Sequence, residues 1–149
     1  VAGASSSGKI GEIQKSYDHL IKNLAIENLK KNPKVSIYGN DYKTKDGTCI
    51  RDYIHVSDLA DIHIKSLKHL NKNNKSFILN CGYGKGYSVK EIVNIFKKTK
   101  KNISINYQER RIGDIDQVYA DIKKSKKYFL WKPKFNNLKV ILRKNKMSD

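Results

Sequence analysis

Hydrophobic and polar positions in the first third of the chain predict a helix, a strand and a long loop. Apolar residues at the spacing of successive helical turns form one stripe, namely Leu20, Ile21, Leu24, Ala25 and Leu29. This helix should end at Asn32-Pro33, because the residue before a proline disfavours helical backbone. A short strand over 35–38 and a turn-rich loop over 39–48 are expected next.

The middle of the chain predicts two more strands around a second helix. Residues 49–56 form the next strand, and Ser57 with Asp58 can cap the helix that follows it. The buried face of this helix should comprise Leu59, Ile62, Leu67 and Leu70. A further strand is expected over 77–79, leading into a tight glycine-rich turn at 82–86.

The last third continues the alternation of helices and strands. Ser88 and Glu91 have the spacing of a capping box that opens a helix, and residues 103–107 alternate as a strand does. A helix near 122–130 and an amphipathic stretch containing Leu138, Ile141 and Leu142 complete the chain. No internal repeat or long linker is present, so residues 1–149 should form one unit with α/β or α+β layering.

Positive charge is the strongest bias of the composition. Lys and Arg total 31 against 14 Asp and Glu, a formal net charge of +17, which raises binding to nucleic acid or to an acidic partner as one functional class. The lysines, however, are scattered in short runs typical of solvated helix faces. Arginines, which read guanine edges best, are few: Arg51, Arg110, Arg111 and Arg143. Specific nucleic-acid binding is therefore disfavoured, and a basic binding module is kept as the alternative.

Several kinds of site and location are disfavoured by the residue pattern. Cys49 and Cys81 form neither a CxxC pair nor a dense framework, which argues against zinc and disulfides and favours reduced thiols in a cytoplasmic protein. The four histidines lack the spacing of metal ligands. No apolar stretch is long enough to cross a bilayer. We expect a soluble, cytoplasmic protein without a metal site.

The chain lacks the motifs with which NAD-linked enzymes hold and use their cofactor. Tyr87 stands where a GxGxxG loop starting at Gly82 would need its last glycine. Two Tyr-x-x-x-Lys pairs, starting at Tyr119 and Tyr128, are as many as chance predicts in a chain so rich in both residue types. We expect no catalytic residue and no NAD bound by this chain alone.

Two arginines stand out in a chain that otherwise uses lysine for positive charge. A forked guanidinium binds phosphate through charge-assisted hydrogen bonds, so Arg51 and Arg111 together would suit a diphosphate. An ion pair is at least as well supported by the residue types, for example Arg51 with Asp52 or Arg111 with Asp114.

The run YGNDYKTKDGTCIRDYIHVSDLA at 38–60 closely resembles the UDP-glucose 4-epimerase family. Further similar segments follow in the order of that family, at 1–4, 19–21, 80–89, 110–114, 120–121 and 130–133. The resemblance implies an α/β fold and places residues 1–149 as the carboxy-terminal, nucleotide-sugar-binding portion of an extended short-chain dehydrogenase/reductase. The chain opens with small residues typical of the end of a buried strand, so we expect a piece of a longer enzyme rather than a trimmed protein.

The resemblance also implies the chemistry of the whole enzyme. A Rossmann domain, absent from this chain, would hold NAD and the Tyr-x-x-x-Lys base, and UDP-glucose and UDP-galactose would interconvert through a 4-keto sugar. This chain would grip UDP and be inactive alone. Removal of the Rossmann partner would expose an apolar face, so a homo-oligomer is possible.

Substrate-binding positions are implied residue by residue. Arg51 and Arg111 match the diphosphate-binding arginines, and Asp114 matches the acid near the uridine ribose. Tyr38 matches an aromatic position against uracil, and Leu20 matches a backbone contact to the base. His19 lies where many relatives have Asn near the phosphates. Two departures leave details of the pocket open, Lys22 in place of a common Pro and Val118 in place of a Tyr of some members.

Overall fold

The computed structural model describes residues 1–149 except 6, 8, 14–18, 99–101 and 144–149. Its helices are α1 (Leu20–Leu29), α2 (Val56–Asn73), α3 (Val89–Lys97), α4 (Lys123–Phe129) and α5 (Leu138–Arg143). Its strands are β1 (Lys34–Tyr38), β2 (Ile50–Arg51), β3 (Tyr87–Ser88), β4 (Ser104–Gln108) and β5 (Gln117–Val118).

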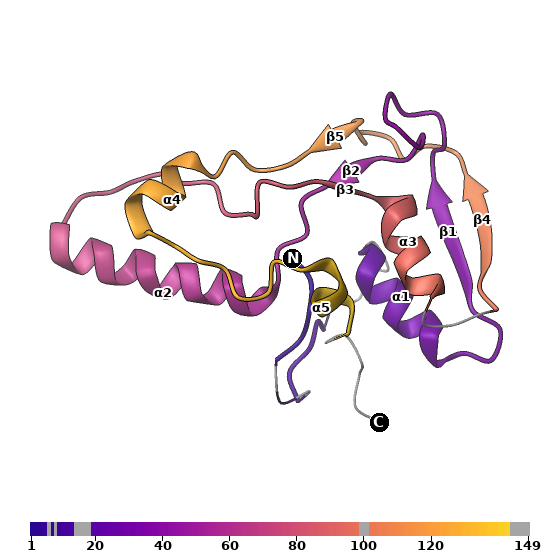
Figure 1. Ribbon diagram of the computed structural model, residues 1–149, viewed down its shortest axis with the longest axis horizontal. Helices are drawn as coiled ribbons and strands as arrows, with labels where there is room; N and C mark the ends of the chain where they lie inside the picture. Colours follow the sequence, from indigo (N-terminus) through magenta and orange to yellow (C-terminus); the bar gives the residue numbers. More distant parts are fainter. Residues whose placement is uncertain (6, 8, 14–18, 99–101, 144–149) are drawn as a thin grey trace.

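The strands form two small sheets, which lie in different parts of the molecule (Figure 1). β1 pairs in parallel with β4 at one end of the molecule, where α1 and α3 pack. β2 lies between β3, which is antiparallel to it, and β5, which is parallel. α2 extends from this middle region to the far end, where α4 lies beside it. The expected α/β class is confirmed.

The main core lies between the β1–β4 sheet and the helices. Alternation along β1 buries Val35 and Ile37 and leaves Lys34, Ser36 and Tyr38 exposed, because successive side chains of a strand point to opposite faces. The buried pair packs in a cluster with apolar residues of α1, α3 and α5. These are Ile21, Leu24, Ile92, Val93, Phe96, Leu138 and Ile141.

A second, smaller core joins α2 to the segment that follows α4. It contains Ile54, Ile62 and Trp131, and the indole N–H of Trp131 donates to Asp61 Oδ2 at 3.1 Å. Beyond it, His69 of α2 contacts the rings of Phe77, Tyr128 and Phe129. Aromatic contacts therefore hold α4 and the chain around Phe77 against the far end of α2.

The buried carboxylate of Asp58 joins segments that share no strand. Asp58, 2% exposed, accepts the Tyr83 hydroxyl at 2.6 Å and the backbone N–H groups of Lys134 and Phe135 at 2.9 Å each. Burial and the hydrogen bond to Asp58 raise the pKa of Tyr83, so its hydroxyl remains a donor. Asp58 thus fastens α2 to the 83–84 turn and to the chain before α5.

The strand expected over 49–56 is much shorter than predicted. β2 covers only Ile50–Arg51, and the chain then leaves the sheet. Asp52 accepts the backbone N–H groups of Tyr83 and Gly84, at 3.0–3.1 Å and 3.0 Å. Ile54 accepts the N–H of Ala2 at 2.8 Å, beside an isolated bridge between Ala2 and His55. Hydrogen bonds between the Asp52 side chain and the 83–84 backbone are therefore found where the prediction placed strand-to-strand hydrogen bonds.

Three details of α2 and its surroundings also differ from the predictions. His55, rather than Ser57 or Asp58, is the N-cap, and its Nδ1 accepts the Ser57 N–H at 3.1 Å. Leu67 and Leu70, expected to be buried, are 60% and 38% exposed. The 77–79 segment is not a strand, because aromatic contacts and side-chain hydrogen bonds hold it instead.

Other expectations are confirmed closely. Ser88 caps α3 through the Glu91 N–H while the Glu91 side chain accepts the Ser88 N–H, a complete capping box. β1, β4, α1 and α4 lie within a few residues of their predicted bounds. No helix among the described residues is long and apolar enough to span a membrane.

We predict that Asp58→Ala destabilises the protein strongly. Three donors would lose their acceptor, and each buried, unsatisfied polar group costs about 1–3 kcal/mol. Tyr83→Phe removes a single hydroxyl and should cost less. Urea denaturation of both variants checks this order, and a larger loss for Tyr83→Phe would contradict it.

We also predict that Leu130→Gly stabilises the protein. Leu130 follows α4 with a left-handed φ of 46° and is 83% exposed, so it has backbone strain but little packing to lose. Relief of that strain is worth roughly 1 kcal/mol or more. Thermal unfolding should show a higher Tm for Leu130→Gly and no increase for the control Leu130→Ala, which keeps a Cβ.

Candidate functional site

Arg51, at the end of β2, is held in place by three acceptors. Its Nη1 donates to the carbonyl oxygens of Ile50 and Ile115, at 2.8 and 2.9 Å, and its Nη2 donates to Asp114 Oδ1 at 3.0 Å. The Arg51 and Asp114 side chains are 26% and 32% exposed, so the pair is only partly screened by solvent. β2 and the 109–116 loop thus fix one guanidinium.

Arg111 lies in the same 109–116 loop and contacts the end of β1. Its guanidinium carbon lies 4.0 Å above the centroid of the Tyr38 ring, a cation–π contact. The Asp114 N–H donates to the Arg111 carbonyl at 3.2 Å and so ties the two contacts together. Tyr38, Arg51, Arg111 and Asp114 therefore form one connected group, which we call the two-arginine cluster.

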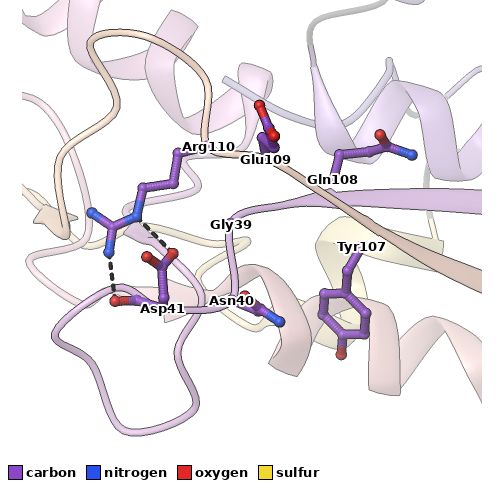
Figure 2. A pocket seen from close by; sticks show the side chains of 7 residues that line it. All are labelled: Gly39, Asn40, Asp41, Tyr107, Gln108, Glu109 and Arg110. Carbon is purple, nitrogen blue, oxygen red and sulfur yellow. Dashed lines mark hydrogen bonds and ion pairs between the residues drawn. The ribbon is translucent and has the colours of Figure 1, made fainter.

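A second cation–π pair lies beside the first. The Arg110 guanidinium lies 4.2 Å from the Tyr42 ring centroid, and its Nε donates to Asp41 Oδ1 at 2.7 Å. Figure 2 shows Arg110 reaching toward Asp41 at the edge of a cavity of about 400 Å³. This cavity is lined by residues at and just after the carboxyl ends of β1 and β4, including Gly39, Asn40, Gln108 and Glu109.

His19 and Leu20, at the start of α1, lie apart from these contacts. His19 Nδ1 lies 2.6 Å from Glu12 Oε1, and Leu20 packs against the main core. His19 also lines a cavity of about 500 Å³ with Val56, Ala60 and the chain around Ala2. None of the contacts described joins this pair to the two-arginine cluster.

The ion pair of Arg51 differs from both pairs suggested by the sequence, Arg51 with Asp52 and Arg111 with Asp114. Arg51 pairs with Asp114, whereas Asp52 is used by backbone N–H groups. Sequence reasoning did not find the stack of Arg110 on Tyr42. The rarity of arginine was the available signal, since Arg110 is one of four in the chain.

The cluster offers cationic donors beside an aromatic ring and a carboxylate. Such a set suits a ligand that combines a phosphate, a planar base and a hydroxyl. Among the described residues, no group of three or more His, Cys, Asp or Glu could hold a metal ion. The groups of the cluster are of the kind that bind and orient an anionic ligand.

A family model described as GDP-mannose 4,6 dehydratase matches residues 11–143. The UDP-glucose 4-epimerase of Azospirillum brasilense is 42% identical over 144 residues, a match that covers 96% of this chain and 41% of that protein. This chain thus spans less than half of the length of that relative.

Solved structures of UDP-glucose 4-epimerases also match this chain over nearly its whole length. UDP-glucose 4-epimerase from Stenotrophomonas maltophila, with bound NAD and formylated UDP-arabinopyranose, matches with a TM-score of 0.86 at 34% identity over 97% of this chain and 44% of that one. The Bifidobacterium longum enzyme in complex with NAD⁺ and UDP matches with a TM-score of 0.82 at 35% identity, over 98% and 44%.

Proposed function

Because the chain belongs to the GDP-mannose 4,6-dehydratase family, we propose that it is the carboxy-terminal, nucleotide-sugar-binding portion of a UDP-glucose 4-epimerase. The supporting observation is the two-arginine cluster, in which Arg51 and Arg111 both bond to Asp114, Arg51 through its guanidinium and Arg111 through its backbone carbonyl. Its roles are those of a UDP site: arginines for the diphosphate, Asp114 for the ribose and Tyr38 for the uracil. The parent enzyme would interconvert UDP-glucose and UDP-galactose.

Epimerisation at a sugar carbon sets a physical requirement that this cluster meets. The sugar must turn over between two hydride transfers, so affinity has to come from the nucleotide and not from the sugar. NAD, bound by the rest of the protein, would supply the hydride acceptor. In our proposal, charge-assisted hydrogen bonds from two partly shielded arginines would supply affinity without touching the sugar.

The surface of α2 supports a second domain. Val56, Ala60, Ile64 and Leu67 recur along one face of the helix, opposite buried Ile62, and all four are exposed. Val56 and Ala60 also line the 500 Å³ cavity, beside Ile10 and Ile13, which are 72% and 101% exposed. Exposed apolar residues that gather on one face support a surface that another domain covers. The covering partner in our proposal is the NAD-binding Rossmann domain of the same protein.

We predict that the full-length protein binds UDP and that Arg111→Ala or Arg51→Ala weakens binding. Loss of a charge-assisted hydrogen bond to phosphate should reduce the affinity roughly tenfold to a hundredfold. Isothermal titration calorimetry measures this directly. Lys72→Ala, which removes one exposed positive charge from α2, is the matched control and should bind as the wild type does.

Two results would contradict this function. UDP binding that is unchanged in both arginine variants would exclude the cluster as the site. Steeply salt-dependent binding to generic DNA, without UDP binding, would favour the basic binding module instead.

The proposed domain contact predicts a context-dependent effect of Leu67→Glu. In the isolated chain this exposed position should tolerate Glu with a change of at most about 0.5 kcal/mol. In the full-length protein the same charge would be buried against the Rossmann domain and should cost roughly 2 kcal/mol or more. Chemical denaturation of both forms measures the difference. Ile78→Glu is the matched control, since Ile78 is 85% exposed and lies outside the α2 face. Equal effects of Leu67→Glu in both forms would contradict the contact.

A further inference from the structure

The loop from Gly39 to Cys49 connects two members of the two-arginine cluster. It begins directly after Tyr38 of β1 and ends just before β2, which carries Arg51. The third member, Arg111, follows Arg110, whose side chain reaches back into this loop. The position of the loop therefore affects all three groups at once.

Tyr42 is the anchor of the loop. It is 3% exposed, and its N–H donates to the Gly47 carbonyl at 3.0 Å, which closes the loop on itself. Gly39, at a φ of +79°, lies so near that a Cβ there would collide with the Tyr42 ring and would lie 2.9 Å from Arg110 Cγ. Gly39, Tyr42 and Arg110 are thus in direct contact.

The far end of the loop is equally fixed. Asp46 accepts the Thr48 N–H at 3.0 Å and the Thr48 hydroxyl at 2.7 Å, and it also accepts the Ser88 hydroxyl. Although burial opposes the charge, these hydrogen bonds hold the pKa of Asp46 below its usual range. The loop therefore behaves as a rigid connection between Tyr38 and Arg51, and Arg110 fastens its near half.

We propose that Arg110 is a positioning residue of the nucleotide site: by stacking on Tyr42 and bonding to Asp41 it fixes Arg111 relative to Tyr38 and Arg51. The inference rests on the proposed UDP-binding function. The Arg110–Asp41 ion pair alone is worth little, because the two side chains are 39% and 68% exposed. Only a planar guanidinium can bond to Asp41 through its edge while its face covers the Tyr42 ring, so lysine cannot replace it.

The test measures UDP and uridine affinity of the full-length protein by calorimetry. Arg110→Lys keeps the positive charge but loses the planar guanidinium that bonds to Asp41 and stacks on Tyr42. It should weaken UDP binding about tenfold, which corresponds to roughly 1.4 kcal/mol. Uridine lacks the diphosphate, so its affinity should fall much less. Tyr42→Leu should resemble Arg110→Lys, whereas Tyr42→Phe, which keeps the ring, should restore tight UDP binding.

A double-mutant cycle distinguishes positioning from a general structural role. If Arg110 acts through Arg111, the double variant with Arg110→Lys and Arg111→Ala loses less affinity than the product of the two single losses. The positioning role would be overturned if the affinity loss of the double variant equalled the product of the two single losses. It would also be overturned if Arg110→Lys weakened UDP and uridine binding equally. Normal UDP binding by Arg110→Lys, together with weak binding by Arg111→Ala, would overturn it and leave the proposed function intact. A wild-type protein that does not bind UDP would overturn both.

Discussion

The rest of this structure depends on the hydrogen bonds accepted by two carboxylates, partly buried Asp52 and fully buried Asp58. The strands β2, β3 and β5 are two residues long, too short to hold the middle of the molecule by ladder hydrogen bonds alone. The two side chains instead accept hydrogen bonds from the 83–84 turn, and Asp58 also accepts them from the chain before α5. Because a buried polar group is tolerated only when it is hydrogen-bonded, the donors that surround Asp58 fix one arrangement of these segments.

Sequence reasoning succeeded where local periodicity decides structure and failed where distant side chains do. The Ser88–Glu91 capping box and the alternation of Val35 and Ile37 need only near neighbours, and both elements formed as predicted. The strand predicted at 49–56 is mostly absent because the Asp52 side chain bonds to the backbone of Tyr83, 31 residues away. Leu67 has helical spacing like Ile62, but spacing cannot say which apolar face packs on the core and which stays exposed in this chain.

The candidate site shows the same division. The resemblance drew attention to Arg51, Arg111 and Asp114, which the fold brings into one connected group. No pattern in the sequence indicated that Arg51 would form its ion pair with Asp114 rather than with adjacent Asp52. Such pairings depend on the return of the 109–116 loop to β2, a contact between residues more than sixty positions apart.

The single tryptophan of the chain has a practical consequence for spectroscopy. Trp131 is 4% exposed, donates to Asp61 and lies in the small core with Ile54 and Ile62, away from the two-arginine cluster in sequence and in contacts. Its fluorescence therefore reports whether the α2–α4 end of the molecule is intact. Loss of that core would shift the emission toward that of a hydrated indole. Ligand binding at the two-arginine cluster would require a separate reporter placed near Tyr38.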